Sequence, residues 1–175
     1  MVEGGGRSAP LPDAIDVGLV HRFGALFRGA QMAGAMEAAL GLSTGYANDR
    51  VQFGRPIARF QAIQQQLALL AEQTAAASVA AESAAIAVAA DRPSSALAVA
   101  AAKIRAGEAA GKVAEIAHQV HGAIGFTHEH SLHRLTRRLW SWRDEFGNES
   151  HWSRELGRAV MAAGADALWP TITTG

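Results

Sequence analysis

The 175-residue sequence contains no cysteine, few aromatic residues and no excess of either charge. The lack of cysteine excludes disulfide bonds, thiolate catalysis and zinc–thiolate sites. Sixteen basic and sixteen acidic residues give a formal charge of zero, which argues against the strongly basic face that nucleic-acid binding requires. No apolar run reaches the roughly 18 residues of a membrane span, and the start MVEGGGRSAPLP lacks the apolar core of a signal peptide. We therefore expect a cytoplasmic protein that binds neither nucleic acid nor membrane.

Alanine is abundant and dominates the pattern of the chain. Hydrophobic residues make up 49% of the sequence and aromatic residues only 6%. Alanine has the highest helix propensity, and its small side chain lets helices pack closely. Apolar residues recur at three- and four-residue spacing, and no stretch shows the alternation of a strand. The predicted helices cover residues 16–49, 59–90, 94–121, 128–143 and 148–164. Their predicted caps are Ser94 or Ser95, Thr127 and Asn148.

These features predict an all-α protein, an up-and-down helical bundle with short connections. Residues 1–14, rich in glycine and proline, are expected to form a flexible N-terminal segment. The bundle is expected to cover residues 15–165, and residues 166–175 to form an irregular tail.

The first candidate site is the stretch Tyr46-Ala-Asn-Asp-Arg-Val-Gln-Phe-Gly-Arg-Pro-Ile57 and the Phe60-Gln61 pair after it. Arg50 can clamp a phosphate through two parallel N–H bonds. Phe53 offers a face for stacking, and Gln52 and Gln61 offer donors and acceptors. The structural alternative is an arginine that satisfies the carbonyls of a helix end, with Phe53 packed under the loop.

Two further stretches join a helix end to a glycine turn. Ala117–Thr127 places Gln119 before a turn of small residues that lets a ligand approach the backbone, although a glycine there also serves as an ordinary helix cap. Arg137–Glu149 combines a turn, a helix N-terminus and two adjacent acids, which suit a polar ligand or acid–base chemistry. Its alternative is a solvated helix end. The seven histidines match no catalytic metal motif, so no metal site is predicted.

Taken in order and at their separations, these three stretches resemble the acyl-CoA dehydrogenase family over roughly residues 15–163. The resemblance implies a helical C-terminal domain that forms the core of a dimer or tetramer, with FAD between two subunits. A set of residues would contact the adenine and pyrophosphate side of a neighbour's FAD: Arg50, Gln52, Phe53, Gln61, Gln119, Gly122 and Ala123.

The resemblance also assigns residues to the chain's own flavin and substrate. Gly147, Asn148 and Ser150 would lie near the flavin bound by the same subunit. Arg158 matches an arginine that the family keeps near its catalytic base.

The sequence departs from the family at the base itself. The family usually has a glutamate directly before the glycine of the last turn, where this chain has Phe146. Some members place the base on the first long helix, where the matching position is Gly24. Glu145 is the remaining candidate for a catalytic base, and it would require a rearranged turn. The stretch Arg138–Gly147 is similar to actinobacterial members, among which non-catalytic partner subunits of steroid side-chain oxidation occur.

Family members are about twice as long and carry an N-terminal helical domain and a middle β-domain. The resemblance therefore implies a C-terminal domain or partial subunit of a flavin-dependent acyl-CoA dehydrogenase, of fatty-acid or steroid β-oxidation. Such a chain would contribute oligomerisation and part of an FAD site, without an orthodox base. Its partners would be acyl-CoA dehydrogenase-like chains, in a homo- or hetero-oligomer, and acyl-CoA would bind through a partner or the missing domains. The alternative is a non-catalytic helical scaffold that no longer binds flavin.

Overall fold

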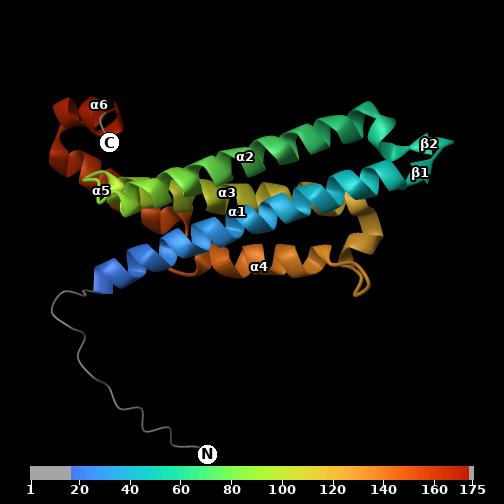
Figure 1. Ribbon diagram of the computed structural model, residues 1–175, viewed down its shortest axis with the longest axis horizontal. Coiled ribbons are helices and arrows are strands. Elements are labelled where there is room, and N and C mark those ends of the chain that lie inside the picture. The colour runs from blue at the N-terminus through green and yellow to red at the C-terminus, as the bar shows by residue number, and fades with distance from the viewer. Residues whose placement is uncertain (1–16, 174–175) are drawn as a thin grey trace, which may run out of the picture.

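A computed structural model describes residues 17–173, which fold mainly as helices (Figure 1). The long helices α1 (Val17–Asp49), α2 (Gln61–Ala89) and α3 (Ser95–His121) run up and down beside one another. They are followed by α4 (Leu132–Asp144), α5 (Glu149–Ala163) and α6 (Ala165–Thr173). The prediction of an all-α, up-and-down bundle is confirmed.

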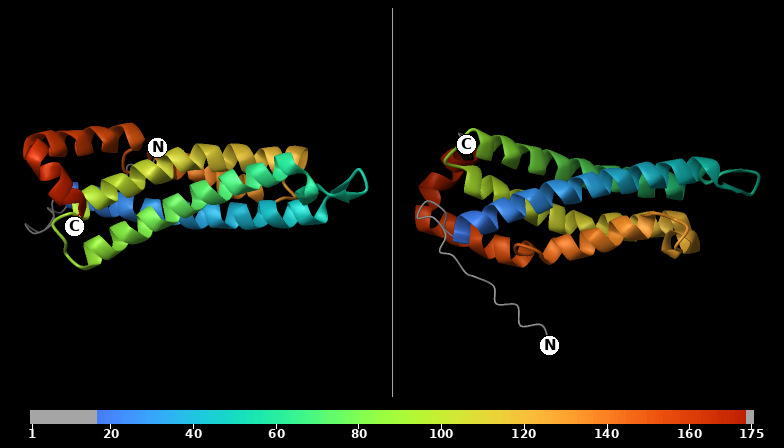
Figure 2. Two further views of the ribbon diagram at one scale, coloured as in Figure 1. Left: turned by 90° about the horizontal axis from the view of Figure 1, so that it is seen from above. Right: turned by 60° about the horizontal axis from the view of Figure 1, so that its bottom comes forward.

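Helix α3 is the centre of the bundle, because it contacts α1, α2, α4 and α5. Its buried side chains are mostly alanines, which allow these close approaches. Larger buried side chains fill the space between the helices: Met32, Met36, Leu70, Val113, Leu132 and Leu139. Helices α5 and α6 lie at the end of the bundle where α1 and α3 begin (Figure 2).

A small hairpin projects from the opposite end, between α1 and α2 (Figure 1). Strands β1 (Val51–Gln52) and β2 (Arg55–Pro56) pair antiparallel, and the 3₁₀ turn η1 (Ile57–Arg59) leads into α2. The expectation of no strand is wrong here, because strands of two residues are too short to show alternation.

The predicted helix caps have three different outcomes. Asn148 is confirmed as the cap of α5, because its side chain accepts a bond from the His151 amide. Ser94 precedes α3 but makes no capping bond. The prediction for Thr127 is wrong, since its hydroxyl donates to the Ile124 carbonyl and closes the 3₁₀ turn η2 (Gly122–Phe126). Helix α4 begins only later.

The tail prediction is also wrong, because residues 165–173 form α6. The last predicted helix ended at residue 164, yet the chain continues as a helix that contains Pro170. Asp166 occupies the first turn, where a negative charge stabilises a helix. The predicted flexible segment 1–14 lies outside the described residues. Within residues 17–173, no helix is long and apolar enough to cross a membrane.

Candidate functional site

The predicted site residues lie at opposite ends of the bundle. The first group surrounds the hairpin and the end of α3, which we call the hairpin end. The second group surrounds the connection between α4 and α5, which we call the turn end (Figure 1). Helix α4 separates them, and its 13 residues span about 20 Å at 1.5 Å per residue. One chain therefore does not bring all the predicted residues together.

At the hairpin end, Phe53 is 92% exposed. Its φ of 52° and that of Gly54, 76°, place both residues in the left-handed region. A two-residue loop with this conformation matches the twist of the hairpin strands and holds the Phe53 side chain outward. The Arg55 guanidinium lies over the Phe60 ring, 4.3 Å from its centre. The hairpin thus presents an aromatic face to its surroundings.

The polar side chains beside Phe53 are also exposed. Within the described residues, no hydrogen bond or ion pair is made by the side chains of Arg50, Gln52 or Gln61. The structural alternative for Arg50, satisfaction of the helix-end carbonyls, is therefore not adopted. These side chains remain free to bind an external group.

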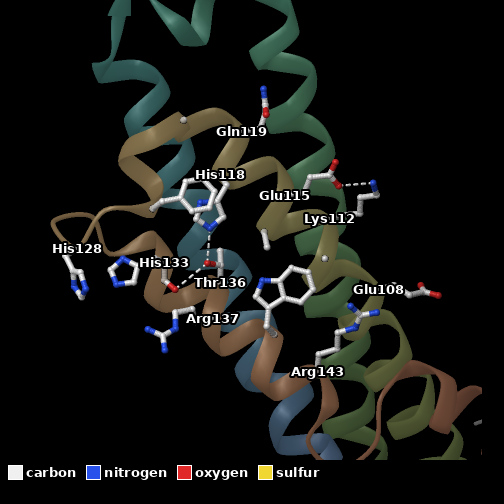
Figure 3. Close-up of a pocket in the computed structure, with 15 residues that line it drawn as sticks. Glu108, Lys112, Glu115, His118, Gln119, His128, His133, Thr136, Arg137 and Arg143 are labelled. Atoms are coloured by element: carbon white, nitrogen blue, oxygen red, sulfur yellow. Dashed lines mark hydrogen bonds and ion pairs between the residues drawn. The ribbon is translucent and has the colours of Figure 1, made fainter.

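Within the hairpin end, the last turns of α1 and α3 contact each other. The Tyr46 ring of α1 stacks on the buried His121 ring of α3, with the ring centres 4.7 Å apart. Gln119 and Gly122 lie on the rim of a groove of about 1100 Å³ between α3 and α4 (Figure 3). Gly122 adopts a φ of 64°, and Ala123 after it is exposed.

The groove has an aromatic and basic wall (Figure 3). The His118 ring stacks on Phe126 at 4.0 Å, and its Nε2 lies 3.0 Å from the Thr136 hydroxyl. Burial lowers the pKa of His118, and the charge of His133 adds to the effect. Arg137 also lines the groove and makes no ion pair within the described residues.

At the turn end, the two positions where the family places a base touch each other. A Cβ added to Gly24 would lie 2.3 Å from Cδ1 of Phe146, so the phenylalanine ring packs directly on the glycine. Phe146 and Gly147 both adopt the left-handed conformation, with φ of 55° and 87°. An apolar contact therefore occupies the two positions that the resemblance matches to the family's base.

The carboxylate of Glu145 is engaged elsewhere. Its Oε2 lies 2.6 Å from Nε of Arg28, and its Oε1 accepts a bond from the Ser141 hydroxyl. The role of Glu145 as a base stays a prediction, and its geometry in this chain is that of an ion pair.

The other predicted residues of the turn end make only local contacts or are exposed. Asn148 caps α5, and Ser150 in the first turn of α5 is exposed. Arg158 is exposed and pairs with Glu155 on the same helix at 2.6 Å. These side chains line the outer surface of the turn and of α5.

A cavity of about 630 Å³ that the sequence did not predict lies at the turn end and is lined by residues of α1, α3, α5 and α6. His21 stacks on Trp152 in its wall, with the ring centres 5.4 Å apart, and His151 meets His21 edge-on at 5.2 Å. Burial lowers the pKa of His21, with smaller contributions from the charges of His151 and Lys103. His21 lies one helical turn before Gly24, and that spacing was the available signal.

No group of three or more histidine, aspartate or glutamate side chains in residues 17–173 could hold a metal ion.

Comparison with known proteins agrees with this geometry. The family model described as "Acyl-CoA dehydrogenase, C-terminal domain" matches residues 22–149. The chain therefore belongs to the acyl-CoA dehydrogenase family, and it corresponds to the helical domain at the C-terminal end of its members.

Several members of the family resemble this chain in sequence or in structure. Over 115 residues, the chain is 45% identical to the 3-sulfinopropanoyl-CoA desulfinase of Paraburkholderia xenovorans, covering 62% of this chain and 29% of the relative. It is 39% identical over 114 residues to the acyl-CoA dehydrogenase IpdE2 of Mycobacterium tuberculosis, covering 65% and 34%. Among solved structures, the ChsE4–ChsE5 complex of Mycobacterium tuberculosis superposes with a TM-score of 0.79 at 30% identity, covering 83% of this chain and 40% of that chain. The chain thus spans about a third of the length of the relatives it matches.

Proposed function

We propose that this chain is the oligomerising, flavin-contacting part of a cytoplasmic acyl-CoA dehydrogenase that performs α,β-dehydrogenation of an acyl-CoA thioester. The main observation in support of this proposal is that the hairpin end and the turn end lie far apart in one chain. If each end contacts a different FAD, two chains must combine to complete one site. The ChsE4–ChsE5 complex, formed by two different chains, supports a homo- or hetero-oligomer as the working form.

The hairpin end fits the adenosine diphosphate part of FAD by its chemistry. The Arg50 guanidinium presents paired donors of the kind that bind phosphate oxygens. The exposed ring of Phe53 offers a face on which adenine can stack. Gln52, Gln61 and Gln119 supply amide groups for the edges of the ring.

The turn end fits the flavin and substrate side of the same chain. Gly147, Asn148 and Ser150 lie on its outer surface, where a β-domain of the family would bring the flavin ring. FAD bound there would supply the acceptor for the hydride that leaves the acyl chain. The cavity beside Phe146, walled by His21 and Trp152, supports binding of the thioester arm near this turn. Two relatives named for acyl-CoA chemistry support the substrate class.

The contact between Gly24 and Phe146 also favours a second function, a scaffold without flavin. Neither residue can accept a proton, and the ring fills the space where a carboxylate would stand. In the leading proposal, the base comes from a partner chain. In the alternative, the bundle only joins other chains.

The Arg50→Ala substitution separates the two functions. We would measure FAD binding by the purified oligomer of the full chain, by equilibrium dialysis, and its native mass. Loss of a charge-assisted contact predicts FAD binding weaker by about tenfold or more, at unchanged mass.

Arg134→Ala, which removes another exposed arginine, is the matched control and should leave binding unchanged. Equal FAD binding by the Arg50→Ala and wild-type oligomers would overturn the proposed contact. An oligomer that takes up no FAD, alone or with an acyl-CoA dehydrogenase-like partner, would support the scaffold.

A further inference from the structure

Lys103 is buried beneath the turn end, with 1% of its surface exposed. Its Nζ donates to the carbonyl oxygens of Arg143 and Gly147, at 2.7 Å each. The first carbonyl belongs to the last turn of α4, where helix carbonyls lack partners within the helix. The second lies just before α5. One ammonium group therefore joins both sides of the connection between the two helices.

This connection needs such support because of its backbone conformation. Phe146 and Gly147 are consecutive left-handed residues, a conformation that is unfavourable for a residue with a side chain. The Trp152 indole donates to the Phe146 carbonyl at 2.9 Å, which adds a second support. The turn is thus held from α3 through Lys103 and from α5 through Trp152.

Charged groups surround the ammonium. Glu149 pairs with Arg143, while its Oε2 is buried without a hydrogen-bond partner. A Cβ on Gly107 would lie only 2.7 Å from that oxygen, so the glycine makes room for the carboxylate. Burial lowers the pKa of Lys103 to about 8, although the charges of Glu149, Asp144 and Glu145 oppose the shift.

We propose that Lys103 is a positioning residue: its ammonium fixes the turn that presents Phe146 to Gly24 and Gly147-Asn148 to the flavin. The part that concerns flavin rests on the proposed function. The part that concerns the turn does not, and it can be tested on the chain alone.

The turn should respond to the charge of Lys103. A neutral amine donates weaker hydrogen bonds than an ammonium group, so the hold on both carbonyls weakens as Lys103 loses its proton. The groups facing Lys103 are Arg143 and Asp144 from α4, Glu145 from the turn, Glu149 from α5 and, from α1, His21.

Three of these groups keep one charge between pH 7 and 9. The pKa of Glu149 is lowered by its bond to Arg143, and that of Arg143 is raised by the same bond. The pKa of His21 is lowered by burial from 6.5. A change of the turn in this pH range that follows the Lys103 signal therefore reports Lys103 rather than these three groups.

The test is an NMR titration of the full chain from pH 7 to 9. Lys103 and Lys112 are the only lysines, so lysine-labelled protein gives two side-chain signals, and Lys112→Met identifies each. We expect the Trp152 indole and Gly147 amide signals to titrate with the Lys103 signal, at a midpoint near 8. Gly54, at the hairpin end, should not follow.

Two variants test whether the titration of the turn depends on Lys103. Lys103→Met should abolish the titration of the Trp152 and Gly147 signals, while Lys112→Met, an exposed position on the same helix, leaves it intact. If Lys103→Met does not fold, the wild-type titration decides alone. Trp152 and Gly147 signals that ignore the Lys103 titration would overturn the proposal, as would a response that disappears in Glu149→Gln while Lys103 still titrates.

FAD binding then separates this proposal from the proposed function. Lys103→Met should weaken FAD binding by the oligomer about tenfold, as expected for losing charge-assisted bonds that hold a binding turn. FAD binding that falls in Arg50→Ala but not in Lys103→Met overturns the flavin part of the positioning role. If wild type binds no FAD, alone or with an acyl-CoA dehydrogenase-like partner, but the turn still titrates with Lys103, the proposed function fails and the hold on the turn stands.

Discussion

Each end of the bundle carries a phenylalanine followed by a glycine, both in the left-handed conformation. Phe53 at the hairpin end is 92% exposed, whereas Phe146 at the turn end is 38% exposed and packs on Gly24. The same local backbone thus serves two purposes. At the hairpin end it turns a ring outward for a contact outside the chain, and at the turn end it turns a ring inward to fill a space within the chain.

The polar side chains also differ between the two ends. Among the described residues, the side chains of Arg50, Gln52 and Gln61 make no hydrogen bond or ion pair, while groups around Phe146 are bonded to one another. The hairpin end therefore offers exposed polar side chains to another molecule, whereas at the turn end most of these groups are engaged within the chain.

The largest expected effect concerns Lys103 and the pH dependence of stability. Its pKa is lowered from 10.5 to about 8 on folding. Between these values the unfolded chain binds more protons than the native chain, so the free energy of unfolding rises with pH, by about 1.4 kcal/mol per unit. Below pH 8 both states are protonated and this contribution to the slope disappears. Urea denaturation between pH 8 and 9.5 would measure it.

Two lysine variants test whether the pH dependence of the free energy of unfolding comes from Lys103. Lys103→Met should remove it, and Lys112→Met should retain it. A wild-type slope no steeper than that of Lys103→Met would show that Lys103 does not titrate in this range.

The next effect tests the contact between Gly24 and Phe146. Gly24→Ala places a methyl group 2.3 Å from the ring, and such overpacking should destabilise the chain by about 1–3 kcal/mol. In a Phe146→Ala background the space is open, and the same substitution should stabilise α1 by up to about 1 kcal/mol, because alanine is the better helix former. The measurement is a double-mutant cycle by urea denaturation.

A control for helix propensity is available on the same helix. A Cβ at Gly29 would meet no atom within 4 Å, so Gly29→Ala should be stabilising in both backgrounds. Equal effects of Gly24→Ala with and without the Phe146 ring would mean that the ring swings away at little cost.

A smaller pH effect is expected at the hairpin end, in a different range. His121 is buried, its Nδ1 bonds to the Ala117 carbonyl, and its Nε2 has no partner. Burial lowers its pKa, although the Ala117 bond opposes the shift. The unfolded chain therefore takes up a proton first as pH falls below 6.5, and stability declines with acidification.

His121→Phe should reduce this acid sensitivity and keep the ring stacked on Tyr46. The check is the thermal midpoint at pH 7 and pH 5, compared with wild type. An unchanged difference between the two pH values would assign the acid sensitivity to other histidines.

The sequence predicted the fold well because alanine-rich periodicity is a local signal, repeated over many residues. Arg50 and Phe53 could be selected as candidates because they belong to a continuous stretch, but the sequence left open whether Phe53 packs under the loop, and only the structure shows it exposed. It could not predict that Phe146 rests on Gly24, since that contact joins positions far apart in the chain. Lys103 escaped notice for the same reason: a lysine in a helix is normally solvated, and only the packing of α4 and α5 buries it.

The smallest effect on stability is expected for Phe53→Ala, and it separates the two ends most clearly. An exposed ring that fills no space within the chain should change the free energy of unfolding by no more than about 0.5 kcal/mol. Phe146→Ala, at an equivalent backbone position, should cost more because its ring packs on Gly24. FAD binding should show the reverse order, with Phe53→Ala weakened by loss of stacking, worth about 0.5–1.5 kcal/mol. If Phe53→Ala destabilised the chain as much as Phe146→Ala, the ring would have an internal role, and the outward function of the hairpin end would be wrong.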